Sequence, residues 1–555
     1  VLDGFPLSQQ GQAARALAAA FSASLLGGIV GAVILTLFVQ IARPLILAFG
    51  SAELFMLALL GLSMVGVLSG ASLARGLAAC GLGLIFGSIG SAPATGEFRI
   101  TFGIDYLYDG LPLVIVGMGL FAFPEITALL RKNRSIATAG VLSGKWLEGV
   151  QDVFRNWFLC LRCAGIGTLI GAIPGLGGTV VDWIAYGHVV QTAKDKSQFG
   201  KGDIRGVLAP ESANNAKEGG GLVPTLLFGI PGSGSMAVFL GGMVLLGIEA
   251  GPAMVSTNLD LTYTIIWSLA IANVLGAGSC LLLARPIARL TTIPFNLLAP
   301  FMIMVVSFAA FQATRQFMDL VVLFAVGLLG IMLKRFGWSR PAFLIGFVLA
   351  PQAEGYLNLA VQFYGWDMFA RPGVLSILGI TLVSVWFGSR NRRGKTEQVS
   401  LDTKNFAGSP SILTRAPQLT FLVGCIVFFL YAVLSSLQLS PLGSMFPLSV
   451  AITTLGLCLY LISTLTVGRI KTSANFDLEY DMRNSSGSIQ NSIWANAGWF
   501  GVLVTTTALL GFLLGTLCFF VAFLKLKAKQ SWRITMVLAA AALILLVSLT
   551  NLLLV

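Results

Sequence analysis

Apolar runs of the length that a bilayer requires recur along this chain of 555 residues. A helix needs about 20 residues to cross a hydrocarbon core of about 30 Å. The chain is 56% hydrophobic and 10% charged, whereas soluble domains carry about 25% charged residues. Because the runs are continuous rather than alternating, an outer-membrane β-barrel is disfavoured. We therefore predict an all-α polytopic membrane protein. Its candidate spans are residues 18–38, 54–69, 77–89, 111–130, 222–248, 264–283, 297–311, 320–333, 341–351, 374–387, 419–437, 447–466, 494–524 and 534–555.

The net charge of +12 indicates membrane orientation rather than an acidic partner. The basic residues gather in a few loops between apolar runs, as the positive-inside rule expects of cytoplasmic loops. No nucleic-acid motif accompanies them, so we expect no nucleic-acid partner. One such loop would contain Arg131, Lys132, Arg134, Lys145, Arg155 and Arg162, and another Arg390, Arg392, Arg393, Lys395 and Lys404.

A change of composition divides the chain. Residues 390–417 are polar, charged and without periodicity, which predicts a cytoplasmic linker between membrane domains at 1–389 and 418–555. In the second domain, the run 494–524 would be about 45 Å long as one helix, too long for one span without strong tilt. A hairpin turning near Gly511 would keep two basic clusters on the same side of the membrane. That turn predicts five crossings in the small domain.

A weak internal repeat is also present. The tripeptide Ala42-Arg43-Pro44 recurs 242 residues later as Ala284-Arg285-Pro286, and residues 54–68 align with 296–310 at the same offset. Arg99 and Phe102 fall near Arg340 and Phe343. We therefore predict a pseudo-repeated transporter fold. Its first repeat would be incomplete, because the chain begins at Val1 inside the motif-like segment LDGFPLSQQGQAARAL.

Residues 165–231 interrupt the apolar pattern with glycines, prolines and polar side chains. Glycine and proline break helices, and unpaired backbone is not tolerated against lipid. Broken segments at membrane depth line substrate sites in transporters, often as re-entrant hairpins. A helix that restarts after Thr179 would offer an anion its N-terminal N–H groups, with Asp182 and Tyr186 following. The alternative is a packing kink between helices.

Two further polar groups follow in this segment. The run Pro210-Glu211-Ser212-Ala213-Asn214-Asn215 offers oxygen ligands for a cation and amides for a carboxylate, although it also fits a solvated loop at a helix start. Phe228-Gly-Ile-Pro-Gly-Ser-Gly234 repeats the Gly-Pro pattern. We predict substrate-binding and ion-coupling residues here and rank Asp319, Glu354 and Asp367 below them. The substrate candidates are Gly175, Gly177, Gly178, Thr179, Asn214, Asn215, Pro231, Gly232 and Ser233, and the ion-coupling candidates are Glu211 and Asp182.

The motifs GAIPGLGG and FGKGDIRGVLAPESANNAKEGGGLVPTLLFGIPGSG resemble the large membrane subunit of the tripartite tricarboxylate transporter family. The resemblance covers about residues 1–388, and residues from about 415 onward resemble, more loosely, that family's small membrane subunit, as if the two were fused. It implies a multi-pass protein of the bacterial inner membrane that takes up citrate or other carboxylates. It also implies a periplasmic solute-binding protein as partner and a sodium or proton gradient as the driving force, with no other cofactor. The family motifs fall on Gly175, Gly177, Gly178, Glu211, Asn214, Asn215, Pro231 and Gly232.

Other classes of function fit less well. An intramembrane hydrolase needs a nucleophile with a base, or a metal, but the chain has one histidine (His188) and a lone Cys160-x-x-Cys163 pair. We expect no metal site. No Gly-x-x-x-x-Gly-Lys-Ser/Thr motif of an ATPase occurs. A solute-sensing or structural membrane subunit stays open as the alternative, and neither the anion nor the coupling ion follows from the residues.

Overall fold

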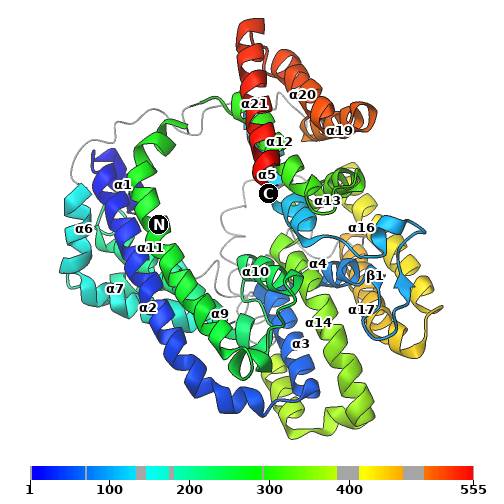
Figure 1. Ribbon diagram of the computed structural model, residues 1–555. Helices are drawn as coiled ribbons and strands as arrows, with labels where there is room; N and C mark the ends of the chain where they lie inside the picture. The colour runs from blue at the N-terminus through cyan, green and yellow to red at the C-terminus, as the bar shows by residue number, and fades with distance from the viewer. Residues whose placement is uncertain are drawn as a thin grey trace.

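The computed structural model describes residues 3–68, 72–132, 146–173, 181–290, 293–383, 412–466 and 493–553, and these are almost entirely helical (Figure 1). Seven described helices are long and apolar enough to cross a membrane, or eight if the pair α6 and α7, bent by 76°, counts as one span. The prediction of an all-α polytopic protein is confirmed. The elements are α1 (Gly4–Gln9), α2 (Ala13–Leu47), α3 (Ser51–Leu68), α4 (Leu73–Gly87), β1 (Gly90–Ser91), β2 (Phe98–Arg99), η1 (Asp105–Leu107), α5 (Leu113–Lys132), α6 (Trp146–Arg155), α7 (Trp157–Gly171), α8 (Val181–Thr192), α9 (Arg205–Phe228), α10 (Gly234–Leu245), η2 (Pro252–Val255), α11 (Leu259–Leu290), α12 (Phe295–Phe311), α13 (Met318–Arg335), α14 (Arg340–Tyr364), η3 (Gly365–Ala370), the helix Pro372–Val383, α16 (Ile412–Ser436), α17 (Pro441–Thr466), α19 (Ile493–Leu510), α20 (Phe512–Ala522), η4 (Phe523–Lys527) and α21 (Trp532–Leu553).

Several predicted boundaries are wrong. The run 222–248 is not one span, because α9 ends at Phe228, Gly229 adopts a left-handed φ of 68°, and Ser233 caps the start of α10. Arg155 and Arg162 lie in α6 and α7 rather than in a loop. Helix α16 begins at Ile412, inside the expected linker. Most of that linker lies outside the described residues.

Helix α9 packs between α2 and α7, and small residues allow close contact on both sides. On the α2 side, a Cβ at Gly31 would lie 2.8 Å from the Ala216 carbonyl oxygen, and Gly27 is closer still to the Ser212 carbonyl. On the α7 side, Gly167 and Gly171 meet the α9 backbone in the same way. Small residues of this kind let helix backbones approach closely where the hydrophobic effect cannot drive association.

Helices α2 and α11 run antiparallel, side by side (Figure 1). Near one end Gln40 Nε2 donates to the hydroxyl of Tyr263 at 2.5 Å, and further along Asn273 Nδ2 donates to the Leu25 carbonyl at 3.0 Å. The later residue of α2 thus meets the earlier residue of α11, which shows that the two helices are antiparallel. The start of α2 is fixed at the opposite end, where Asp3 accepts from the backbone N–H groups of Gly202 and Asp203.

Two other long pairs are parallel. In the α4–α14 pair, Gly83 meets the Phe343 carbonyl and Gly87 the Phe347 carbonyl. In the α5–α13 pair, a Cβ at Gly119 would lie 3.1 Å from the Gly327 backbone nitrogen, and Lys334 Nζ lies 2.8 Å from a Glu125 carboxylate oxygen one or two turns further along both helices. Arg99 lies in β2 whereas Arg340 begins α14, so the expected match between these two residues is wrong.

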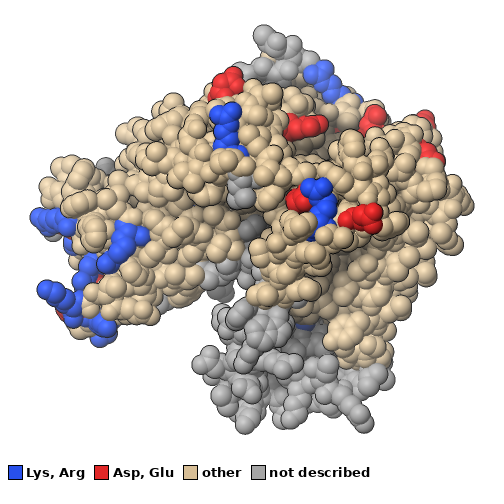
Figure 2. Space-filling view, turned by 90° about the horizontal axis from the view of Figure 1, so that it is seen from below, with Lys and Arg blue, Asp and Glu red and all other residues tan. Residues whose placement is uncertain are grey.

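The C-terminal helices pack in two groups. Helices α16 and α17 lie against each other, with α17 also against α4, whereas α19–α21 lie against α5, α12 and α13 (Figure 1). The turn predicted at Gly511 is confirmed, since its φ is 77° and α19 and α20 fold back on each other with Gly515 against Thr507. Figure 2 shows a face on which uncharged residues dominate, while Lys and Arg gather near one edge. Such a surface suits helices that face lipid.

The strand pair β1–β2 fastens α17 to the rest of the protein. Arg99 forms a bidentate ion pair with Glu354 of α14 at 2.6 and 2.7 Å, and both side chains are almost fully buried. The same guanidinium donates to the Gly443 carbonyl of α17 at 3.2 Å. Beside it, Glu97 accepts from the backbone N–H and the hydroxyl of Ser440. Three segments that are far apart in the sequence therefore meet at one buried charge pair.

Candidate functional site

A polar cluster lies where α2, α9 and α11 meet, and we define it by Ser24, Glu211, Asn215 and Asn273. Ser24 Oγ donates to Glu211 Oε2 at 3.0 Å. Asn215 Nδ2 donates to the Ser24 carbonyl at 2.7 Å and to Asn273 Oδ1 at 2.5 Å. The cluster therefore connects the antiparallel helices α2 and α11 to α9.

Local sequence explains why these side chains meet. Glu211 and Asn215 stand four residues apart on α9, so they share one face of the helix. Gly28 of α2 lies directly against the Asn273 amide, where a larger side chain would displace it. Helical spacing places Asn214 on the flank of α9 next to Glu211 and turned away from the α2 and α7 contacts.

Helix α8 brings a second acid toward the same region. Asp182 stands in the first turn of α8, which packs on α9, and its Oδ1 is buried with no hydrogen-bond partner among the described residues. It is close enough for electrostatic attraction to Lys217 and for repulsion from Glu211. Lys217 Nζ also lies 3.7 Å from the neighbouring Glu218 carboxylate. Three carboxylates and one ammonium thus lie on α9 and the adjoining end of α8. The unpartnered oxygen of Asp182 is suited to a cation or a proton.

The second Gly-Pro motif lies near the end of α7. Pro231 and Gly232 occupy the break between α9 and α10, and a Cβ on Gly232 would lie 3.5 Å from the Gly171 carbonyl oxygen. Ser233 caps α10 by accepting from the Met236 N–H at 3.3 Å. Gly175, Gly177, Gly178 and Thr179 fall in residues 174–180, outside the described residues. The break between α9 and α10 nevertheless lies next to Gly171, which is the last residue of α7 and precedes that segment.

The reading of residues 210–215 as a solvated loop is wrong. Helix α9 runs through Pro210 and Pro224 without interruption, and Ser212 and Ala213 are fully buried. Proline removes one backbone hydrogen bond, but close packing on both sides compensates by holding the helix in place. Glu211 and both asparagines are therefore presented from a helix, which positions side chains more rigidly than a loop does.

The lower-ranked polar residues have structural roles where contacts are described. Asp319, in the first turn of α13, accepts from the backbone N–H groups of Thr314 and Gln316 in the preceding loop and from the Tyr106 hydroxyl. Glu354 pairs with Arg99. His188 has a buried Nε2 that finds no partner within the described residues. No group of three or more His, Cys, Asp or Glu side chains in the described part of the chain could hold a metal ion.

Two members of the cluster were not found from the sequence. Asn273 is the one amide in the otherwise apolar middle of α11, and Ser24 stands in an alanine- and leucine-rich stretch of α2. A single amide inside a spanning run is itself a signal, because polar side chains in membrane helices usually face a partner or a cavity. The partner of Ser24 could not be read from the sequence, since 187 residues separate it from Glu211.

A helical bundle that encloses polar side chains and broken helices at membrane depth has the construction of a membrane transport protein rather than of an enzyme. Residues 1–345 match the Tripartite tricarboxylate transporter TctA family, and the chain belongs to that family. It is a multi-pass membrane protein.

Two proteins of Agrobacterium vitis are similar to this chain. One, described as "Uncharacterized 52.8 kDa protein in TAR-I ttuC' 3'region", is 30% identical over 389 residues, which cover 69% of this chain and 77% of the relative. The other, "Uncharacterized protein in TAR-II ttuC' 3'region", is 33% identical over 222 residues, 40% of this chain and 92% of the relative. No solved structure matches the chain significantly.

Proposed function

We propose that this protein takes up organic carboxylate anions, citrate or other tri- and dicarboxylates, by secondary active transport across the bacterial inner membrane. A periplasmic solute-binding protein delivers the anion, and a sodium or proton gradient drives uptake. Family membership supports transport of tricarboxylates by a tripartite system. The observation that carries the finer proposal is the Ser24–Glu211–Asn215–Asn273 cluster, with Asp182 beside it.

In this proposal the acids couple the ion and the amides hold the anion. Glu211 and Asp182 supply carboxylate oxygens, which can bind either a sodium ion or a proton. Asn214 and the Gly-Pro segments supply N–H donors to the substrate carboxylates, with Gly175, Gly177, Gly178, Thr179, Pro231, Gly232 and Ser233 forming the backbone part of the site. Asn215, whose two side-chain N–H groups donate to Ser24 and Asn273, would turn them to the substrate when it binds. The ion neutralises the acids, and only then does an anion bind next to them at low energetic cost.

We also propose an inverted pseudo-repeat as the basis of alternating access. Adding 242 to the bounds of α2 gives 255–289, close to those of α11, and the two helices are antiparallel. In the same repeat, α4 corresponds to α13 and α5 corresponds to α14. The parallel pair α4–α14 therefore corresponds to the parallel pair α13–α5. Gly119 and Pro124 of α5 then correspond to Gly346 and Pro351 of α14, and both glycines lie in helix contacts. The offset falls to 227 in this pair because the β1–β2 segment is inserted before α5.

Two membrane domains are part of this proposal. Residues 1–389 would carry the transport site, and a domain that begins with α16 at Ile412 would be equivalent to the small membrane subunit, with the linker before it. The contacts of α17 with β2 and of α19 with α5 support a tight association of the two domains.

The test is uptake by proteoliposomes that contain the chain with a solute-binding protein. Labelled citrate and a panel of dicarboxylates are offered under sodium and proton gradients imposed separately. We expect gradient-driven accumulation that needs the binding protein. The Glu211→Gln variant should lose at least about tenfold in rate, equivalent to roughly 1.4 kcal/mol, while the matched exposed variant Glu249→Gln should transport normally.

Each result has a defined meaning. Normal uptake and ion dependence in Glu211→Gln would refute the coupling role of this acid. Anion binding without accumulation under any gradient would favour the alternative of a sensing subunit.

A further inference from the structure

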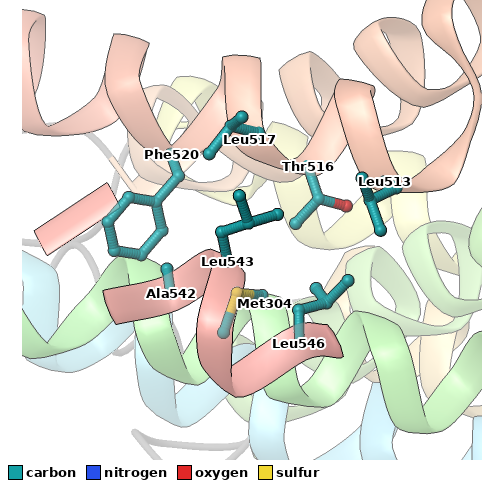
Figure 3. Close-up of a pocket in the computed structure, with 8 residues that line it drawn as sticks. All are labelled: Met304, Leu513, Thr516, Leu517, Phe520, Ala542, Leu543 and Leu546. Carbon is teal, nitrogen blue, oxygen red and sulfur yellow. The ribbon is translucent and has the colours of Figure 1, made fainter. Parts of the chain in front are cut away.

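A crevice opens between α12, α20 and α21, away from the polar cluster. Its lining includes Met304 of α12, Thr516 and Phe520 of α20, and Ala542 and Leu546 of α21. Figure 3 shows side chains of α20 and α21 directed toward one another, with Met304 beside the α21 side chains and the Thr516 hydroxyl as the one oxygen drawn. The enclosed part of this space has room for about one water molecule, and the rest of it is open to the surroundings.

The surroundings of this crevice indicate contact with lipid. Helix α21 leaves large apolar side chains uncovered, such as Met536, Val537 and Ile544, each more than 60% exposed. Such a surface is stable only against hydrocarbon or another protein. The Thr516 hydroxyl is buried and finds no hydrogen-bond partner among the described residues. The crevice is therefore a shallow groove that faces hydrocarbon, against which an acyl chain can lie.

A basic turn lies at one end of the same helix pair. It carries Lys525, Lys527, Lys529 and Arg533, and residues 493–553 contain no Asp or Glu. Helix α12, which packs against η4, has no acidic residue either. Lys525 Nζ lies 4.7 Å from the ring of Trp532, which is 58% exposed. Tryptophan and lysine side by side are typical of the headgroup level of a bilayer.

The spacing of the turn and the crevice fits one leaflet. Nine residues separate Lys525 from Thr516, and nine separate Arg533 from Ala542. Both separations correspond to roughly 14 Å along a helix, close to half of a hydrocarbon core of about 30 Å. A lipid whose phosphate lies on the basic turn would therefore place an acyl chain at the depth of the crevice.

We propose that α20 and α21 bind one anionic phospholipid, with its phosphate on the basic turn and an acyl chain in the α12–α20–α21 crevice. Clusters of Lys and Arg next to a membrane helix attract anionic lipids, and here no described acid of the same segment neutralises them. The site shares no residue with the Glu211 cluster.

Native mass spectrometry of the full chain tests the proposal after reconstitution in phosphatidylcholine vesicles with 25% phosphatidylglycerol. One variant combines Lys525→Gln, Lys527→Gln and Lys529→Gln. Its control removes the same charge from the exposed α8–α9 loop through Lys194→Gln, Lys196→Gln and Lys201→Gln. We expect the first triple variant to lose retained phosphatidylglycerol at least tenfold and the control to keep it.

A second pair of variants tests the crevice. Ala542→Phe fills it and should also reduce retention, whereas Ala541→Phe, on the exposed side of α21, should not. Unfolding temperature and elution volume are measured for all four variants, so that a folding defect is recognised. Equal loss in both charge variants, retention unchanged by Ala542→Phe in a folded protein, or a lipid-free dimer would each overturn the proposal. The last result would assign the crevice to a second copy of the chain.

Discussion

At the scale of single residues, buried polar groups carry most of the information about this protein. The Arg99–Glu354 pair is buried and the Glu211 cluster is half-buried, and their partners also differ in kind. Arg99 donates two hydrogen bonds to the Glu354 carboxylate, so this ion pair has a structural role. Glu211 accepts one bond from a hydroxyl, and Asp182 has a free oxygen, so these acids keep capacity for a ligand.

The Arg99–Glu354 pair leads to a stability prediction. The Arg99→Met variant leaves the Glu354 carboxylate buried without a counter-charge, which should cost about 3–5 kcal/mol. The double variant Arg99→Met with Glu354→Met removes both charges and should recover most of that loss. Thermal unfolding of the purified protein in detergent measures both. A single variant as stable as the unchanged protein would show that water reaches this pair.

The sequence predicts residue roles only where the signal is local. Glu211, Asn214 and Asn215 stand out because polar residues cluster within six positions of an apolar chain. Ser24 and Asn273 are single polar residues in apolar runs, and their significance comes from contacts across 187 and 58 residues. No periodicity of one segment encodes such a contact, because the register of two packed helices depends on their small residues together.

At the scale of elements, glycine positions decide which helices can meet. Gly31→Leu should force α2 away from α9, since its Cβ would already lie 2.8 Å from the Ala216 carbonyl. Overpacking of this kind costs about 1–3 kcal/mol or more. The matched change Gly276→Leu in α11 meets no atom within 4 Å and should be tolerated.

Unfolding temperature and uptake rate distinguish the two glycine variants. We expect Gly31→Leu to lower both, because the Glu211 cluster depends on the α2–α9 distance. Equal behaviour of Gly31→Leu and Gly276→Leu would contradict close packing at this contact.

Elements were predicted well where apolar length or charge balance decides them. The turn at Gly511 follows from the need to keep two basic clusters on one side, and the structure has it. The run 222–248 shows the limit of this reasoning, since hydropathy continues through residues where the backbone turns. Its Gly-Pro signal was present, but only the left-handed φ of Gly229 and the cap of Ser233 reveal where the helix ends.

At the scale of the whole molecule, the two ends of the bundle differ in charge. The loop that holds Lys194, Lys196 and Lys201 lies at the start of α2, next to the Asp3 contact. The other end of α2 packs on η2, near Tyr356 and the Arg99–Glu354 pair. There the segment 97–109 carries three acids and one arginine. The positive-inside rule predicts that the first end is cytoplasmic and the second periplasmic.

Labelling of single cysteines checks this orientation. In a background with Cys280→Ala and Cys518→Ala, which leaves the buried cysteines, Asp105→Cys should react with an impermeant maleimide in intact cells. Lys196→Cys should react only after the membrane is opened. The reverse pattern would invert the topology and place the segment 97–109 in the cytoplasm.

The junction of β2, α14 and α17 has a consequence for how the protein is made. When Arg99 is synthesised, its partner Glu354 is still 255 residues from synthesis and Gly443 is 344 residues away. The guanidinium must therefore wait in water, outside the hydrocarbon, while the helices from α5 to α14 are made. The junction of β2, α14 and α17 therefore forms late in biogenesis. Its formation depends on the arrival of α17 rather than on the insertion of the segment that carries Arg99.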